Sequence, residues 1–118
     1  MAQHADDLDR AAAFYSDLLG SAPSGRFDPP GLLFFDLAGT RLLLEAGAPS
    51  TVLYLRVESV RDTVEGLRAR GVPIETEPHV IFTHVADALG PAGTDEWHAF
   101  LRDSEGNLVG LVSHEAHG

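Results

Sequence analysis

The sequence predicts an α+β fold of two βαβββ modules, whose strands form a cupped, mixed and antiparallel sheet with the helices on its outer face. Two helical patterns lie roughly fifty residues apart, and each is followed by strand patterns that end in a hairpin. Neither half has enough apolar surface to bury its sheet alone, so both are expected to pack into one domain, 1–118. The N-terminal module is placed at 1–49 and the C-terminal module at 50–118.

The first module begins with a short strand pattern followed by a helix. Only the letters MAQHA precede the helix, so the first strand of this module is expected to be truncated. The helix covers the phrase DDLDRAAAFYSDLLG, with Asp7 as its N-cap and Gly20 at its C-terminal end. The apolar runs LLFFDL and RLLLEA then predict a hairpin with its turn at 38–40.

The second module repeats this order with a longer first strand, TVLYLRV. Its helix covers SVRDTVEGLRARG, with Ser59 as the N-cap and Gly71 at the end. The runs HVIFTH, WHAFL and NLVGLVS predict three further strands. A long loop is expected at 85–96, either as a lid over a binding site or as a mobile surface loop.

Alternation along the strands predicts which side chains point away from the helices and toward the concave face of the cup. These residues form a candidate ligand surface: Leu43, Glu45, Val52, Tyr54, Arg56 and Gly110. Gly110 interrupts an otherwise apolar strand, and a glycine in a strand interior often marks a place that another group approaches closely.

Composition excludes several classes of function. The chain has 118 residues, 44% of them hydrophobic, and a formal net charge of −10, which argues against nucleic-acid binding because phosphate contacts need clustered cations. No apolar run is long enough to span a membrane. The absence of cysteine excludes disulfides and thiolate metal sites, and together with the lack of a signal peptide it favours a cytoplasmic protein.

Three phrases resemble the vicinal oxygen chelate superfamily, which includes glyoxalase I, methylmalonyl-CoA epimerase, extradiol dioxygenases and the bleomycin-resistance proteins. They are DDLDRAAAFYSDLLG, VESVRDTVEGLRARGV and FLRDSEGNLVGLV, and the resemblance covers nearly the whole chain. It implies a homodimer, and in metal-dependent members a divalent ion held by the first and last strand of each module. The matching positions are Leu43, Val52, Gly110 and a position just before Met1. These residues offer no donor, so the usual metal site is expected to be missing, with Gly110 interpreted as a vacant ligand position facing open space.

Glu45 and His79 are the candidate catalytic residues. Glu45 is either a general base or a replacement metal ligand, or else it pairs with Arg56 or lies in water at the rim of the cup. His79 is either a general base or ligand contact on the cup face, or a hydrogen-bonded structural residue. Its position depends on the expectation that the neighbouring Val80 and Phe82 face the core.

Two aromatic residues and the remaining histidines complete the list of candidates. Tyr54 and Trp97 are suited to contact a ligand, although core packing is the alternative for Trp97, whose face alternation does not fix. His84 is expected to be exposed at the start of the loop. The other four histidines show no spacing that pairs them: His4, His98, His114 and His117.

The leading functional hypothesis is a small-molecule-binding protein similar to the drug-sequestering resistance proteins, without a cofactor and with its ligand in the apolar cup. The alternative is an epimerase or lyase that acts on a small carbonyl compound or acyl thioester through a divalent manganese, cobalt, nickel or zinc ion. In a third interpretation the domain serves only as a surface for a partner chain. The expected partners are a small molecule and a second copy of the chain.

Overall fold

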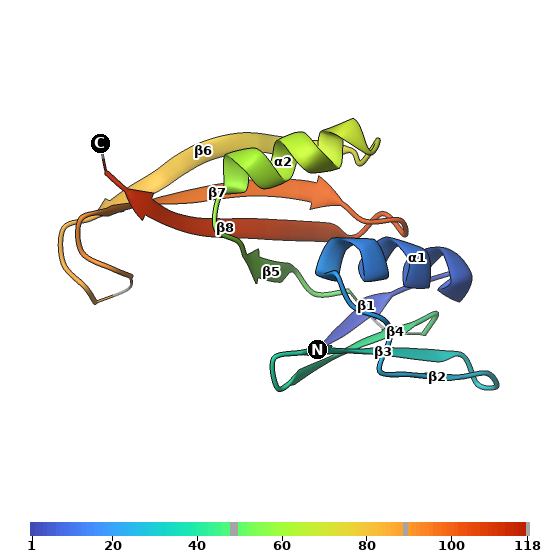
Figure 1. The fold of residues 1–118 in the computed structure, drawn as a ribbon. Helices are drawn as coiled ribbons and strands as arrows, with labels where there is room; N and C mark the ends of the chain where they lie inside the picture. The colour runs from blue at the N-terminus through green and yellow to red at the C-terminus, as the bar shows by residue number, and fades with distance from the viewer. Residues whose placement is uncertain (48–49, 89, 118) are drawn as a thin grey trace. The chain divides into compact units, whose positions relative to one another are not determined.

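The computed structural model describes residues 1–47, 50–88 and 90–117, which form two helices and eight strands (Figure 1). In chain order the elements are β1 (Ala2–His4), α1 (Leu8–Leu19), β2 (Gly25–Phe27), β3 (Leu32–Leu37), β4 (Thr40–Glu45), β5 (Leu53–Arg56), α2 (Val60–Ala69), β6 (Ile74–His84), β7 (Thr94–Arg102) and β8 (Leu108–Ala116). The predicted α+β fold with two βαβββ modules is confirmed.

The chain forms two compact units, each with its own mixed sheet. The first unit comprises 1–51 and 103–107, and the second comprises 52–102 and 108–118. The strand order is β1-β4-β3-β2 in the first sheet and β5-β8-β7-β6 in the second. In each sheet the first strand of the module pairs in parallel with its last strand, and all other pairs are antiparallel.

Both helices begin at their predicted N-caps, and α1 ends at the predicted Gly20, whereas α2 ends at Ala69 with Arg70 as its C-cap, one residue before the predicted Gly71. The Asp7 carboxylate accepts a hydrogen bond from the backbone N–H of Arg10, and the helix ends at Gly20, which has a positive φ of 69°. The Ser59 hydroxyl caps α2 in the same way, by accepting from the N–H of Asp62. Within the described part of the chain, neither helix combines the length and apolar character needed to cross a membrane.

In each unit the helix covers one face of the sheet, and the core of that unit lies between its helix and its sheet (Figure 1). The residues buried in the first unit come from every second position of β3 and β4 and from one stripe of α1: Ala5, Ala11, Tyr15, Leu33, Phe35, Leu42 and Leu44. The second unit follows the same pattern: Leu53, Val60, Val64, Leu67, Ala99, Leu101, Val109 and Leu111. Alternation therefore predicts the covered face of β4, β5 and β8 correctly, since Leu42, Leu53 and Val109 are buried as expected.

Strand β6 departs from the predicted alternation. The sequence analysis places Val80 and Phe82 in the core, but they are 40% and 42% exposed. Register shifts between Ile74 and Phe82 change which residues of β6 lie opposite β7, so a simple count of odd and even positions fails there. Strand β7 begins at Thr94, which shortens the predicted loop at 85–96 to 85–93.

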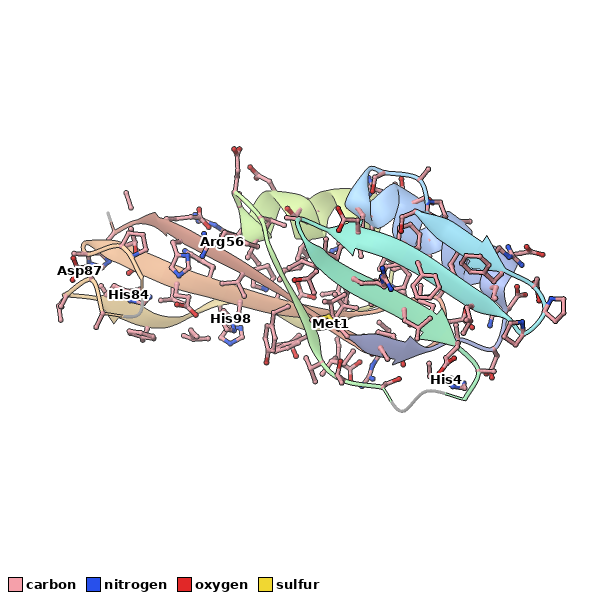
Figure 2. All side chains as sticks on the ribbon, turned by 90° about the horizontal axis from the view of Figure 1, so that it is seen from below. Met1, His4, Arg56, His84, Asp87 and His98 are labelled. Carbon is pink, nitrogen blue, oxygen red and sulfur yellow. The ribbon has the colours of Figure 1, made fainter. Side chains whose placement is uncertain are left out.

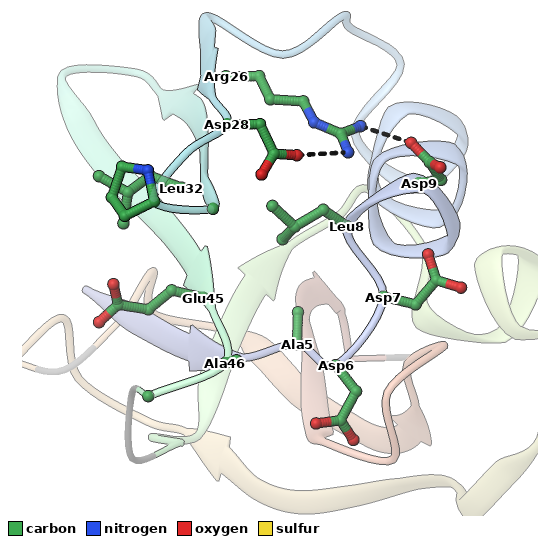
Figure 3. Close-up of a pocket in the computed structure, with 13 residues that line it drawn as sticks. Ala5, Asp6, Asp7, Leu8, Asp9, Arg26, Asp28, Leu32, Glu45 and Ala46 are labelled. Carbon is green, nitrogen blue, oxygen red and sulfur yellow. Dashed lines mark hydrogen bonds and ion pairs between the residues drawn. The ribbon is translucent and has the colours of Figure 1, made fainter.

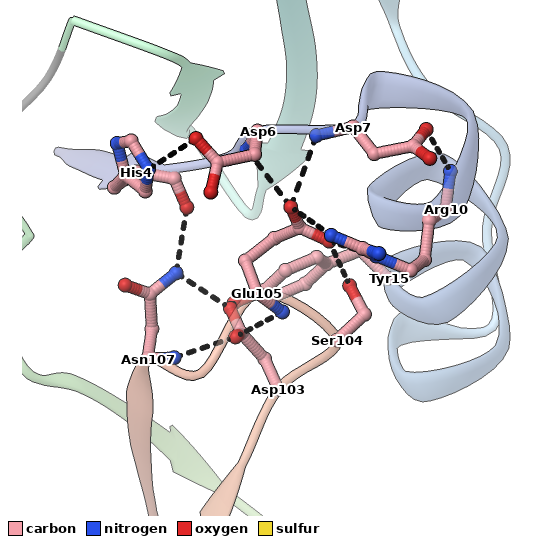
Figure 4. Close-up of polar contacts among 9 residues, drawn as sticks. All are labelled: His4, Asp6, Asp7, Arg10, Tyr15, Asp103, Ser104, Glu105 and Asn107. Carbon is pink, nitrogen blue, oxygen red and sulfur yellow. Dashed lines mark hydrogen bonds and ion pairs between the residues drawn. The ribbon is translucent and has the colours of Figure 1, made fainter.

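The turn between β7 and β8 is organised by the Asp103 carboxylate (Figure 4). One oxygen accepts hydrogen bonds from the backbone N–H groups of Glu105 at 2.8 Å and Asn107 at 2.7 Å. The other accepts from the Tyr15 hydroxyl of α1 at 2.6 Å and from the Asn107 side chain at 2.9 Å. Since Tyr15 is fully buried, its hydroxyl needs this partner, and the turn and the helix satisfy one another.

Glu105 binds the same turn to the start of α1. Its carboxylate accepts hydrogen bonds from the backbone N–H groups of Asp6 and Asp7, at 2.8 and 3.0 Å, which no helical carbonyl can satisfy. It also forms a two-pronged ion pair with the guanidinium of Arg10, at 2.7 and 3.0 Å. The hydrogen bonds from Arg10 hold the pKa of Glu105 at about 2, below its ordinary value of 4.5.

We predict that Glu105→Gln lowers the free energy of unfolding by about 2 kcal/mol, because it removes a charge-assisted pair and weakens the acceptor for two backbone N–H groups. Urea unfolding at neutral pH measures this change. Glu77→Gln is the matched control, since Glu77 pairs with Arg68 on the surface and 64% of its side chain is exposed. An equal loss of stability in the two variants would contradict the assigned role of Glu105.

The depressed pKa of Glu105 also predicts how stability depends on pH. A carboxylate with a lower pKa in the folded state stabilises the fold above its unfolded pKa, and this contribution is lost as pH falls through the folded pKa. The loss therefore occurs between about pH 5 and about pH 2. Unfolding curves recorded across this range should fall less steeply for Glu105→Gln than for the wild type, and parallel curves would refute the assignment.

Candidate functional site

The face of the second sheet that is turned away from α2 carries an aromatic cluster. Tyr54 of β5 is 53% exposed, and its ring lies 5.8 Å from that of Phe100 and 6.0 Å from that of His98, measured between centroids. Phe100 and His98 are successive residues of β7 on this face, two positions apart. The sheet thus presents a partly exposed cluster of tilted and edge-on rings, a type of surface that binds apolar or aromatic ligands.

Gly110 provides room for this cluster and does not face open space. A Cβ atom at Gly110 would lie 2.6 and 2.7 Å from two ring atoms of Tyr54 and 3.1 Å from Phe100. The interpretation of Gly110 as a vacant metal-ligand position with free space in front of it is therefore wrong. The glycine is needed because Tyr54, its neighbour across the parallel β5–β8 pair, lays its ring over the backbone.

The other two positions that the family resemblance assigns to metal ligands are also unsuited to a metal. Val52 is an exposed aliphatic residue just before β5. Leu43 lies in register with Phe34 on the face of the first sheet that α1 leaves uncovered. Aliphatic side chains and a glycine under an aromatic ring offer no donor atom, so these residues do not fit the divalent ion of the metal-dependent relatives.

Next to Leu43, the first sheet has an aromatic surface of its own. Phe27 is 55% exposed and packs edge-on against Phe34, with ring centroids 6.0 Å apart. The Arg41 guanidinium lies over the Phe34 ring, 5.2 Å from its centroid. Together with Ser24 and Gly25, these three residues line a pocket of about 400 Å³.

Glu45 lines a different pocket of the first unit, with a volume of about 460 Å³ (Figure 3). Most charged groups there already have partners: Arg26 binds both Asp9 and Asp28, and Asp7 caps α1. Among residues 1–47, 50–88 and 90–117, Glu45 has no side-chain hydrogen bond or ion pair. Within the described residues, Glu45 is thus a carboxylate of this pocket that is available to contact a ligand.

The remaining predicted residues lie in the second unit. Arg56 is exposed at the end of β5, two residues from Tyr54 on the same face. His79 is exposed, bonds the carbonyl of Glu77 through Nδ1 at 3.0 Å and lies in register with His98. Trp97 lies on the opposite face, because the guanidinium of Arg61 from α2 covers its ring at 4.1 Å.

Three histidines surround one carboxylate at the far end of the second sheet, a cluster that the sequence did not predict; two of them, His84 and His98, are labelled in Figure 2. His84 and His114 each approach Oε1 of Glu96 through Nε2, at 2.8 and 3.1 Å, and His98 approaches Oε2 at 2.7 Å. His84 is 1% exposed, so the expectation of an exposed His84 is wrong. Burial alone would raise the pKa of Glu96, but the hydrogen bonds from His84, His98 and His114 outweigh burial and lower it below its ordinary value.

The loop after β6 closes over this cluster. A Cβ atom at Gly90 would lie 2.8 Å from Cε1 of His84 and 3.0 Å from Cδ2 of His114, so the backbone packs directly on both rings. The cluster also adjoins a pocket of about 460 Å³ that His114 lines with Arg56, Val57, Glu58 and Pro91. Gly90 of this loop thus packs on a cluster of polar side chains, and the role of the loop as a lid stays a prediction.

A signal for part of the cluster was present in the sequence. The β7–β8 hairpin is symmetric about Glu105, so counting outward equally from the turn pairs Glu96 with His114 and His98 with Val112. His84 joins from β6, opposite Thr94, but only after the register shifts in that strand. The sequence therefore contained the Glu96–His114 pair, whereas the contribution of His84 required the structure.

Comparison with known proteins identifies one superfamily, and the similar solved structures have its fold. The sequence matches the Glyoxalase/Bleomycin resistance protein/Dioxygenase superfamily over residues 1–111. None of the curated proteins matches significantly. Among similar solved structures is an antibiotic-binding protein from a Streptomyces species, with 20% identity, a TM-score of 0.73 and coverage of 98% of this chain and 93% of that one.

Two further structures have the same fold. A lactoylglutathione lyase from Agrobacterium tumefaciens is 23% identical, with a TM-score of 0.68 and coverage of 96% of this chain and 90% of that one. A glyoxalase/bleomycin resistance protein/dioxygenase from Alicyclobacillus acidocaldarius is 21% identical, with a TM-score of 0.66 and coverage of 97% and 88%. At these identities the likeness establishes the fold and leaves the activity open.

We predict that Gly110→Ala destabilises the protein by about 1 kcal/mol, because the added methyl group collides with the Tyr54 ring and forces it to move. In a Tyr54→Ala background the same substitution should be neutral or slightly stabilising, since alanine restricts the unfolded chain more than glycine does. Urea unfolding of the four proteins forms a double-mutant cycle. An equal effect of Gly110→Ala in both backgrounds would contradict the packing of Tyr54 on Gly110.

Proposed function

The chain belongs to the Glyoxalase/Bleomycin resistance protein/Dioxygenase superfamily, and we propose that it is a small-molecule-binding member that does not use the superfamily's usual metal site. The observation that carries this proposal is the exposed aromatic surface on the uncovered face of the second sheet. Tyr54, His98 and Phe100 lie there within 6.5 Å of one another, measured between ring centroids. Soluble proteins seldom leave such a surface uncovered unless something binds to it.

The proposed ligand has a flat apolar part and a polar group. Tyr54 and Phe100 supply stacking and edge contacts, while Arg56 on the same face orients an oxygen or a carboxylate of the ligand. The exposed Phe27 and the pocket beside Phe34 and Arg41 are a second surface of the same kind in the first unit. The net charge of −10 favours ligands that also carry a positive charge.

The antibiotic-binding protein from Streptomyces supports this interpretation by analogy, because a protein of the same fold binds an antibiotic. The lactoylglutathione lyase supports, by the same kind of analogy, the alternative function of an epimerase or lyase that acts on a small carbonyl compound or acyl thioester. That alternative is less well supported, since Leu43, Val52 and Gly110 provide no metal donors where the family has them. Glu45 and His79 remain the candidate general bases for such a reaction.

A homodimer is part of the proposal. β5 is a short edge strand of its sheet, and two neighbouring apolar or aromatic residues, Val52 and Tyr54, are 44% and 53% exposed. Edge strands with exposed apolar residues are usually covered in the functional assembly. A second copy of the chain would cover this edge, whereas a different partner chain would support the third interpretation, a domain that serves as an interaction surface.

We predict that a panel of aromatic natural products, with bleomycin as the first member, contains a ligand that binds the wild type in isothermal titration calorimetry. Tyr54→Ala should weaken binding about tenfold because it removes the central ring of the surface. Arg56→Ala should lower the affinity only for ligands that carry an anionic or carbonyl group. Val85→Ala is the control, since Val85 is 93% exposed on the loop. Unchanged affinity in Tyr54→Ala, or no ligand in the panel, would contradict the proposal.

A further inference from the structure

We propose that His84, Glu96 and His114 form a binding site for a divalent transition-metal ion, with zinc as the representative metal. The site lies where β6 and β8 end and β7 begins, beside the loop that joins β6 to β7 (Figure 1). On β8 it is four residues beyond Gly110, a separation of about 13 Å at the rise of a β-strand. It is therefore separate from the positions where the superfamily resemblance places metal ligands, and it does not depend on the proposed ligand-binding function.

The three donor atoms already lie at distances close to those between the ligands of one ion. Nε2 of His84 and Nε2 of His114 are 2.8 and 3.1 Å from Oε1 of Glu96, and all three donors lie within 4.8 Å of one another. Around a tetrahedral zinc ion, with bonds of about 2 Å, neighbouring donors are about 3.3 Å apart. Small rotations of the side chains would bring the three donors to that geometry.

The surroundings hold these side chains in place before a metal binds. His84 is 1% exposed, and the side chains of Glu96 and His114 are each 14% exposed. Glu96 and His114 lie opposite one another on the paired strands β7 and β8, and Gly90 packs against both histidine rings. Side chains on paired strands lose little further freedom on binding, which favours affinity.

The cluster holds the donor types that a divalent transition-metal ion prefers. Three imidazoles approach one carboxylate, and each carries its proton on Nε2 when it donates to Glu96. When a metal binds, the ring protons of His84 and His114 are on Nδ1, and both Nε2 lone pairs face the ion. The carboxylate of Glu96 then provides negative charge directly to the metal.

His98 is assigned a positioning role. Its Nε2 lies 2.7 Å from the second oxygen of Glu96, Oε2, so it can hold the carboxylate with Oε1 directed toward the other two histidines. Two imidazoles and one carboxylate, without sulfur, favour zinc, cobalt, nickel or copper over magnesium or calcium. Three protein ligands also leave a position of a tetrahedral ion for water or for a group of a bound ligand.

The test is zinc binding by the full chain, freed of metal with a chelator and titrated in competition with a chromogenic zinc indicator. We expect one zinc ion per chain and a rise in the melting temperature on addition of zinc. Glu96→Gln and His114→Gln should each weaken zinc binding at least a hundredfold, and His98→Gln about tenfold. His117→Gln is the matched control, because it removes an exposed histidine of the same unit that lies outside the cluster and should leave the affinity unchanged.

Cobalt gives a second readout that a purely structural cluster would not produce. Tetrahedral Co²⁺ bound to nitrogen and oxygen has intense visible absorption, which should appear in the wild type and in His117→Gln and disappear in His114→Gln. His114 is partly accessible, so its variant tests the site even where a substitution of the buried His84 prevents folding. Failure of the wild type to bind zinc, one ion shared by two chains, or equal losses in control and cluster variants would each overturn the proposal.

Discussion

The attachment of the Asp103–Asn107 turn to the first helix is the interaction on which the first unit depends. Asp103 folds the turn around its own carboxylate and gives the buried Tyr15 hydroxyl its partner, while Glu105 satisfies two backbone N–H groups just before α1 and pairs with Arg10. One short turn thus supplies the partner of the buried Tyr15 hydroxyl and also pairs with two exposed backbone N–H groups and the Arg10 guanidinium at the start of α1. This gives a physical reason for the acidic turn followed by Gly106 and Asn107: its residues hold the turn against the first helix.

The fold could be predicted from the sequence because its determinants are local. Capping by Asp7 and Ser59, the left-handed Gly20 and the alternation in β4, β5 and β8 each act over a few residues, and each agrees with the structure. The role of Gly110 could not be predicted in this way. Alternation assigns a face to the glycine, but what covers it depends on the side-chain conformation of Tyr54 on another strand. A glycine in an alternating strand is compatible both with an empty ligand position and with an aromatic ring packed on its backbone.

The histidine cluster was hard to predict for a different reason. Its residues lie far apart in the sequence, and their spacing matches no metal-binding motif. The Glu96–His114 pair follows from the symmetry of the β7–β8 hairpin, and a register derived from the turn would have found it. His84 could not be placed, because bulges in β6 change which of its residues face the carboxylate. Bulges of this kind often occur near functional sites. For this reason β6 is the strand in which the direction of each side chain is hardest to predict from the sequence.

One face of β8 joins two different chemical environments. Gly110 lies under an aromatic surface that has no metal donors, and His114, four residues along, belongs to a cluster of imidazoles and a carboxylate. Metal content alone therefore does not distinguish a binding protein from a metal-dependent enzyme in this chain, because an ion at the cluster would leave the superfamily's ligand positions unchanged. The distinction depends on where the ion sits relative to the ligand. His114 and Arg56 line the same pocket of the second unit, so a polar ligand oriented by Arg56 and a metal held by His114 would occupy adjoining space. In that case the metal would act by orienting a ligand, a role that apolar residues at the family's metal positions do not prevent.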